Sequence, residues 1–323
     1  LVANAGIGKD DLGDEGAARQ VRDAHDQAVE AALEWAERHV VWSRRGHGGT
    51  RQVRGQGLIA AAFRHRTSRN GDPHLHTHVL VPNMVLGVDG KWATIDARWV
   101  YTSAKTIGYL YEAQLRHNLT VALGVEWGQV VKGIADVEHI PAGVLKAFST
   151  RRAEIEERMA VRNQHSAKAA MIAALDTRQR KQPDPGNTEL RGRWCERSAE
   201  IGFDPADLRD AIGRTEPTPI SSEAQRSIED RLLGAHGLTA HDSTFDRNAV
   251  LMAWCDSLAA GAPIERIEEL AEALIDRMET VPLSGVVPGK GAVIRDAAGH
   301  TISMLPPQER WTTFELLDIE RRA

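Results

Sequence analysis

The segment Phe63-Arg-His-Arg-Thr-Ser-Arg-Asn-Gly-Asp-Pro-His-Leu-His-Thr-His78 decides the fold of this chain. Its centre, residues 69–73, is a strong turn signal, because Asn-Gly suits the left-handed backbone of a tight hairpin turn. The apolar runs on either side, at about 51–67 and 75–86, are typical of strands. We therefore predict an antiparallel hairpin whose turn is centred on Asn70 and Gly71.

Three histidines fall on one face of this hairpin. With the turn centred on 70–71, His65 lies opposite His76, and His78 shares their face because strand residues i and i+2 point the same way. A strand histidine is usually packed or solvated, but three that converge through an independent turn argument favour a metal site with open positions. We expect His74 to be a solvated turn residue and not a fourth ligand.

The same segment resembles the histidine motif of conjugative relaxases of the TrwC/TraI type, the MobF class. The resemblance extends over roughly residues 18–215, through the stretches 92–96, 101–119 and 173–181. The residues of the motif that carry it are His65, Thr67-Ser68-Arg69, Asp72-Pro73, Leu75-His76-Thr77-His78 and Asn83.

The resemblance implies a metal, a substrate and a reaction. In that family three histidines hold a divalent metal that polarises one phosphodiester of single-stranded DNA at a transfer origin. A tyrosine then attacks and stays joined to the 5′ phosphate. By resemblance, His65, His76 and His78 bind Mg²⁺ or Mn²⁺, whereas three imidazoles by their own chemistry would suit Zn²⁺ at least as well.

The tyrosine nucleophile is not found in this sequence. The family's nucleophilic tyrosines lie near the N-terminus, ahead of the position of Leu1, so we expect an N-terminally truncated relaxase that is inactive by itself. Of the tyrosines present, Tyr109 and Tyr111 fall in a predicted helix, and we interpret them as packing residues. The catalytic set therefore contains no residue of this chain.

A basic block surrounds the first arm of the hairpin. The chain has a net charge of −5, yet residues 38–71 contain eight arginines and no acidic residue. Such a block would attract a phosphate backbone, with binding that weakens steeply as salt rises, although a solvated strand face would have the same composition. Arg69, in the turn, is the first candidate for contact with DNA. The other candidates are Arg66, Arg64, Arg45 and Arg44.

Composition places the chain among ordinary globular proteins. It has 323 residues, of which 42% are hydrophobic, and it contains no apolar run long enough for a membrane helix. The two cysteines, Cys195 and Cys255, are far apart and match neither a zinc pattern nor a disulfide framework. We expect a cytoplasmic location, with proteins of the conjugation machinery as further partners by resemblance.

We predict an α+β fold with an antiparallel sheet of about five strands, which carries the three-histidine hairpin and has helices on one face. The size of that sheet comes from the resemblance. A helix is expected at 17–39, and another at 102–122 with Thr102 or Ser103 as its N-cap and Gly124 after its end. Residues 1–214 form the relaxase-like domain, 215–222 a linker, and 223–323 a mostly helical region that resembles the beginning of a helicase part.

Three functions remain open from the residues. The first is a relaxase domain without its tyrosine nucleophile. The second is a non-catalytic remnant that binds metal and single-stranded DNA. The third is a zinc-type hydrolase with a water nucleophile, which ranks last because no glutamate adjoins the histidines to act as general base.

Overall fold

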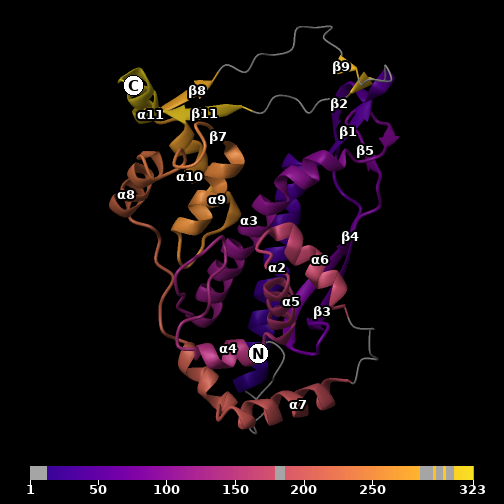
Figure 1. Ribbon diagram of the computed structural model, residues 1–323, viewed down its shortest axis with the longest axis vertical. Helices are drawn as coiled ribbons and strands as arrows, with labels where there is room; N and C mark the ends of the chain where they lie inside the picture. The colour runs from indigo at the N-terminus through magenta and orange to yellow at the C-terminus, as the bar shows by residue number, and fades with distance from the viewer. Residues whose placement is uncertain (1–12, 179–185, 284–293, 296–300, 303–308, 323) are drawn as a thin grey trace.

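The computed structural model describes residues 13–178, 186–283, 294–295, 301–302 and 309–322. Two long helices form its centre: α2 (Gly13–His39) and α3 (Ala97–Leu123) pack against each other, and the other elements surround this pair (Figure 1). The mixture of helices and short antiparallel ladders confirms the predicted α+β class.

The sequence explains where the two central helices begin and end. In α2 a stripe of small residues at helical spacing is buried, including Ala24, Ala28 and Ala32. The start predicted for α3 at residue 102 was wrong. Asp96, which is 2% exposed, accepts hydrogen bonds from Arg98 and Gln52 and caps the helix six residues earlier. Gly124 ends α3 as predicted, with a left-handed φ of 61°.

The strands between α2 and α3 form three antiparallel pairs instead of one continuous sheet. Within the described residues β1 (Trp42–Arg45) pairs with β2 (Arg51–Arg54), β3 (Ala61–Thr67) with β4 (Pro73–Leu80), and β5 (Val85–Leu86) with β6 (Trp92–Ala93). Isolated bridges, Ser43 to Ile95 and Gly55 to Gly87, connect the first pair to the third. The prediction of about five strands in one sheet therefore differs from the structure.

Strand β2 ends just before Gly55, where the backbone passes through a tight space. A Cβ atom there would lie 2.6 Å from Cγ1 of Val41 and 2.5 Å from Cγ2 of Val85, so the backbone passes between two buried valines where only glycine fits. The run expected to be one strand at 51–67 is thus two strands, β2 and β3, which join different ladders.

Several helices follow α3, and two of them contact the turn of the β3–β4 hairpin. The helices in this part of the chain are α4 (Ala142–Ala147), α5 (Thr150–Val161), α6 (Ala167–Asp176), α7 (Asn187–Glu200) and the 3₁₀ segment η2 (Pro205–Ala211). α4 and α7 meet in a small second core made by Val144, Phe148, Leu190 and Trp194.

The C-terminal region contains helices and a small sheet. Its helices are α8 (Ser222–Leu233), α9 (Arg247–Ser257), α10 (Ile264–Ile275) and α11 (Phe314–Arg322). The antiparallel strands β7 (Phe245–Asp246), β11 (Arg310–Thr313) and β8 (Thr280–Leu283) pair in that order, and β9 (Ile294–Arg295) pairs with β10 (Thr301–Ile302). None of the helices in the described ranges has the length and hydropathy that crossing a bilayer requires.

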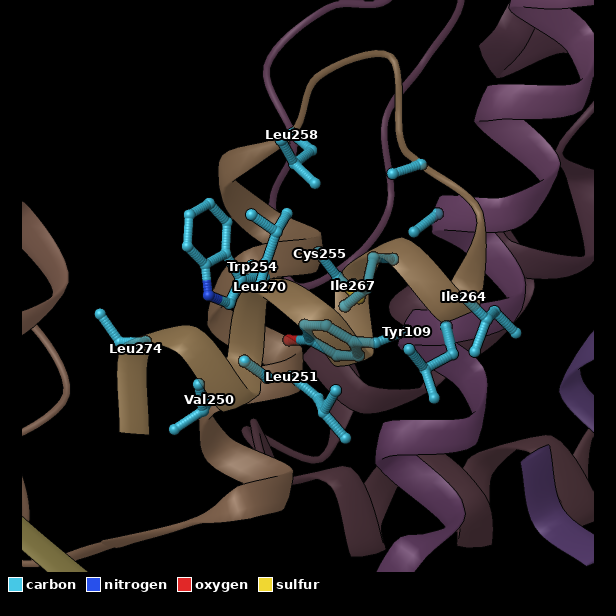
Figure 2. Close-up of a cluster of buried hydrophobic side chains, with 14 of the residues drawn as sticks. Tyr109, Val250, Leu251, Trp254, Cys255, Leu258, Ile264, Ile267, Leu270 and Leu274 are labelled. Atoms are coloured by element: carbon cyan, nitrogen blue, oxygen red, sulfur yellow. The ribbon is translucent and has the colours of Figure 1, made fainter. Parts of the chain in front are cut away.

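The main hydrophobic core spans the expected linker at 215–222. Trp35 of α2 and Leu110 of α3 belong to the same buried cluster as Trp254 of α9 and Leu270 of α10, part of which Figure 2 shows. Arg116, 1% exposed, donates from its guanidinium to the carbonyl oxygens of Gly133, Cys255, Leu258 and Ala259. The helices on both sides of the linker are therefore packed together, and the domain division at 215–222 stays a prediction.

Candidate metal centre

From Ala61 to His65 the β3–β4 hairpin has the register predicted from its turn, and the register shifts between His65 and Thr67. His65 pairs with His76, and Phe63 pairs with His78. The turn closes through a hydrogen bond from Ser68 N to Asp72 O of 2.9 Å. Gly71 has a φ of 80°, a backbone conformation that glycine adopts without strain. Local sequence therefore sets the pairing that brings the three histidines to one face.

The three imidazoles lie close enough to share an ion. Each offers one nitrogen, and the three nitrogens lie within 4.8 Å of one another. A tetrahedral ion with metal–nitrogen bonds of about 2.1 Å needs nitrogens about 3.4 Å apart, so small side-chain rotations would close the site. His65 and His78 are exposed and His76 is half-buried, which leaves room for a substrate ligand on the open side.

His74 orients His76 without joining the cluster. The Nδ1 atom of His76 lies 3.0 Å from the carbonyl oxygen of His74. A carbonyl only accepts, so Nδ1 carries the proton and Nε2 is left free to bind a metal. The two rings also stack, with centroids 4.7 Å apart and planes inclined by 22°. His74 is exposed, as predicted, but it supports a neighbouring imidazole.

The opposite face of the hairpin rests on α2. Thr77, between the two ligand candidates of β4, shares a hydrogen bond of 2.8 Å with Nε2 of His25. The other ring nitrogen of His25 shares one of 2.8 Å with the hydroxyl of Tyr111. Burial lowers the pKa of His25 and raises the pKa of Tyr111. Sequence reasoning missed His25, although its place in the buried stripe with Ala28 and Ala32 was a signal, since a polar side chain in such a stripe needs partners.

The turn of the hairpin is fixed by a buried carboxylate. Asp72, 2% exposed, accepts from the hydroxyls of Ser68 and Thr150 and from Nη1 of Arg197, at 3.1, 2.7 and 2.9 Å respectively. Trp194 donates from Nε1 to the carbonyl oxygen of Gly71 at 2.8 Å. Helices α5 and α7 thus hold the turn, while α2 holds the strands.

The five arginines expected to contact DNA differ in their surroundings. Arg45 donates to both carboxylate oxygens of Asp89 at 3.0 and 3.2 Å, and Arg64 pairs with Asp26 of α2. Arg44 lies 3.9 Å from Asp96 and is 46% exposed. Arg66 and Arg69 are both half-buried, Arg66 at the end of β3 and Arg69 in the turn. The structure places Arg69 on the turn of the histidine hairpin itself.

The three tyrosines differ in their surroundings. Tyr101 is 80% exposed and Tyr109 is buried in the main core. The hydroxyl of Tyr111 bonds to His25, which lies behind the hairpin. The interpretation of Tyr109 as a packing residue fits its place in the core, whereas Tyr111 also contributes a hydrogen bond.

The hairpin thus brings three imidazoles together on one face, where they could hold a metal ion. The sequence model of the TrwC relaxase matches residues 11–201, more than half of the chain. This chain therefore belongs to the TrwC relaxase family.

Two curated relatives from Escherichia coli share the name multifunctional conjugation protein TraI. One is 31% identical over 287 residues, and the one from strain K12 is 30% identical over 285 residues. Each alignment covers 83% of this chain and 16% of the relative. The chain thus spans about one sixth of the length of these relatives.

Solved structures of the conjugative relaxase TrwC in complex with OriT DNA share this fold. The metal-free complex has a TM-score of 0.54 and 29% identity, covering 63% of this chain and 69% of that one. The copper-bound complex has the same TM-score and identity, and the match covers 63% of this chain and 68% of that one. A further metal-bound complex is 30% identical with a TM-score of 0.54.

Proposed function

We propose that this chain is a conjugative relaxase domain without its tyrosine nucleophile. Such domains nick and transfer DNA at a specific site of one strand by metal-assisted transesterification. The observation that carries the proposal is the convergence of His65, His76 and His78 in a chain of the TrwC relaxase family. The similar TrwC structures are complexes with OriT DNA, which supports single-stranded transfer-origin DNA as the substrate.

The metal centre would hold a divalent cation. Copper-bound and metal-bound structures of TrwC support a divalent metal, and the three imidazole nitrogens of this chain could hold one. We propose Mg²⁺ or Mn²⁺, with Zn²⁺ as the alternative that the all-nitrogen donor set favours. When bound, the cation would polarise a non-bridging phosphate oxygen of the DNA.

DNA would approach over the turn and the adjoining basic surface. We propose Arg69, in the turn beside the histidines, as the first phosphate contact, because it forms no ion pair within the described residues. Arg66, Arg64, Arg45 and Arg44 are the further candidates. Arg64 and Arg45 would have to leave Asp26 and Asp89 to bind phosphate. An arginine that must first give up a carboxylate gains less free energy from binding a phosphate than an arginine without an ion-pair partner does.

We propose that none of the three tyrosines of this sequence is the nucleophile and that the chain by itself binds DNA without cleaving it. Tyr111 supports this view, because burial holds its pKa above the usual range and its hydroxyl bonds to His25 behind the hairpin. We further propose proteins of the conjugation machinery as partners and the cytoplasm as the location, which two free cysteines fit.

Binding of Mn²⁺ and DNA tests the proposal. The full chain is titrated with Mn²⁺ and Zn²⁺ by calorimetry, then with single-stranded and double-stranded oligonucleotides of equal length at several salt concentrations. The relaxase proposal is supported if the wild-type chain binds one metal ion, His76→Ala loses it, and single-stranded DNA binds more tightly than double-stranded DNA. Turnover of bis(p-nitrophenyl) phosphate with Zn²⁺ would support a hydrolase instead, and absence of any metal or DNA binding would overturn the proposal.

A further inference from the structure

A chain of hydrogen bonds links three elements behind the histidine face. Tyr111 of α3, His25 of α2 and Thr77 of β4 are joined by two contacts of 2.8 Å each. His25 is 3% exposed, so its imidazole has little access to water. A buried neutral imidazole must find one acceptor and one donor in the protein, and the two hydroxyls supply both.

Through Thr77 these hydrogen bonds reach the strand that carries His76 and His78. Thr77 lies between His76 and His78 on β4 and points to the opposite side of the ladder, because side chains alternate along a strand. Its cross-strand partner is Arg64, which neighbours His65 and pairs with Asp26. Two consecutive residues of α2, His25 and Asp26, therefore hold the hairpin directly behind all three histidines.

The hairpin depends on such support because its ladder has only two strands. Within the described residues β3 and β4 pair with each other and with no further strand. A two-stranded ladder is only marginally stable by itself. By contrast, α2 is anchored in the main core through Trp35, which is 1% exposed, and so provides a rigid base.

We propose that His25 is a positioning residue, which fixes β4 through Thr77 and so holds His76 and His78 in place beside His65. This inference rests on the proposed function of the histidines as metal ligands. The buried ring of His25 holds β4 through a hydrogen-bond chain with two links. The Asp26–Arg64 ion pair is exposed at both ends and contributes less to the stability of this contact. The buried imidazole selects one position of the strand because moving β4 would leave a ring nitrogen without a partner.

Thr77→Val tests the proposal with the smallest change of shape. The variant removes the hydroxyl that bonds to His25, while Thr77→Ser keeps it. Tyr111→Phe removes the hydroxyl at the other end of this hydrogen-bond chain, and Tyr109→Phe on the same helix is its control. Thr280→Val removes another buried hydroxyl, which donates to the carbonyl oxygen of Leu274 far from the hairpin in the sequence.

Two measurements on the full chain separate positioning from general stability. Calorimetry with Mn²⁺ gives the affinity of the histidine site, and hydrogen exchange of the metal-free protein gives the protection of the β4 amides. We expect Thr77→Val to weaken Mn²⁺ binding about tenfold, as loss of outer-shell partners does at metal sites. Exchange should accelerate in 73–80 and stay unchanged in α9 and α10. Thr77→Ser and Thr280→Val should keep wild-type affinity.

Wild-type affinity and β4 protection in Thr77→Val would overturn the inference, as would an equal loss in Thr77→Ser. Loss of affinity in Thr280→Val as large as in Thr77→Val would also overturn it, because general destabilisation would then be the cause. If the wild-type chain binds neither Mn²⁺ nor Zn²⁺, the proposed metal function fails. The exchange measurement then decides by itself whether His25 holds β4.

Discussion

The carboxylate of Asp72 and the guanidinium of Arg197 form an ion pair of 2.9 Å across 125 positions of sequence. Asp72 belongs to the turn of the histidine hairpin and Arg197 to helix α7. The Asp72 side chain is 3% exposed and also accepts from Thr150 at the start of α5. The turn is therefore part of the helical packing and not a free surface loop.

Asp72→Ala should lower the free energy of unfolding by about 3 kcal/mol, because it leaves several half-buried donors, Arg197 among them, without their acceptor. Urea unfolding followed by circular dichroism measures the loss. Asp210→Ala, at an exposed position, should stay within about 0.5 kcal/mol of wild type. Equal effects of the two variants would show that the Asp72 contacts do not stabilise the fold.

His76→Ala should abolish the binding of one Mn²⁺ ion, because the remaining two imidazoles lack a third nitrogen from the hairpin. His74→Ala is the matched control. It removes the ring that stacks on His76 but keeps the carbonyl oxygen that orients it, so binding should persist with a modest loss. Titration calorimetry measures both, and unchanged affinity in His76→Ala would refute the assignment of the ligands.

Arg69→Ala should weaken binding of single-stranded DNA evenly across sequences and reduce the slope of log K against log salt by about 0.7, the value for one phosphate contact. Arg45→Ala should leave that slope nearly unchanged, because Arg45 is already bonded to Asp89 and to the carbonyl oxygen of Lys91. Fluorescence anisotropy at several salt concentrations measures the slopes. A larger change of slope in Arg45→Ala would reverse the proposed order of contacts.

Acid should weaken the attachment of α10 to α2 through Glu268. Burial by itself would raise the pKa of Glu268, but hydrogen bonds from His39 and Arg247 and the charge of Arg38 lower it to about 2 from an ordinary 4.5. A lowered pKa means that the carboxylate stabilises the fold above about pH 4.5, and that this stability is lost as the pH falls towards 2.

In the wild type the free energy of unfolding should fall between about pH 4.5 and 2, and Glu268→Gln should make this fall smaller by about 3 kcal/mol at most. Urea unfolding at a series of pH values measures it. Glu269→Gln, on the exposed side of the same helix, should retain the wild-type acid profile. A wild-type profile in Glu268→Gln would contradict the role of this carboxylate.

Gly261→Ala should destabilise the contact between the C-terminal region and α3. A Cβ atom there would lie 1.9 Å from the carbonyl oxygen of Ala113, and the φ of Gly261 is 69°. Since that carbonyl belongs to a buried helix and cannot move freely, we expect a loss of about 3 kcal/mol. Thermal unfolding measures it.

Gly202→Ala is the control for backbone strain without a clash. Gly202 has a φ of 68°, and nothing lies within 4 Å of the added Cβ. Its loss should be about 1 kcal/mol, the cost of the left-handed backbone conformation by itself. Similar losses in both variants would mean that the close approach to Ala113 is not tight.

Local signals were sufficient where one element decides the structure. The turn at Asn70 and Gly71 predicted the pairing of His65 with His76, and the structure confirms it. The helix predicted at 17–39 corresponds to α2, and Gly124 ends α3 as predicted. The start of α3 was misplaced because its cap, Asp96, depends on partners from elsewhere, Gln52 among them.

The sequence by itself determined the face that the three histidines share, because strand alternation and turn geometry act over a few residues and place the imidazoles together wherever the hairpin lies. Only the tertiary structure decided what holds that hairpin: His25 behind Thr77, and Thr150 and Arg197 around Asp72. These partners are 52 to 125 positions apart. Contacts at such separations arise from the packing of whole helices. This packing leaves no periodic pattern in the sequence, so the partner of a buried polar side chain cannot be predicted from it.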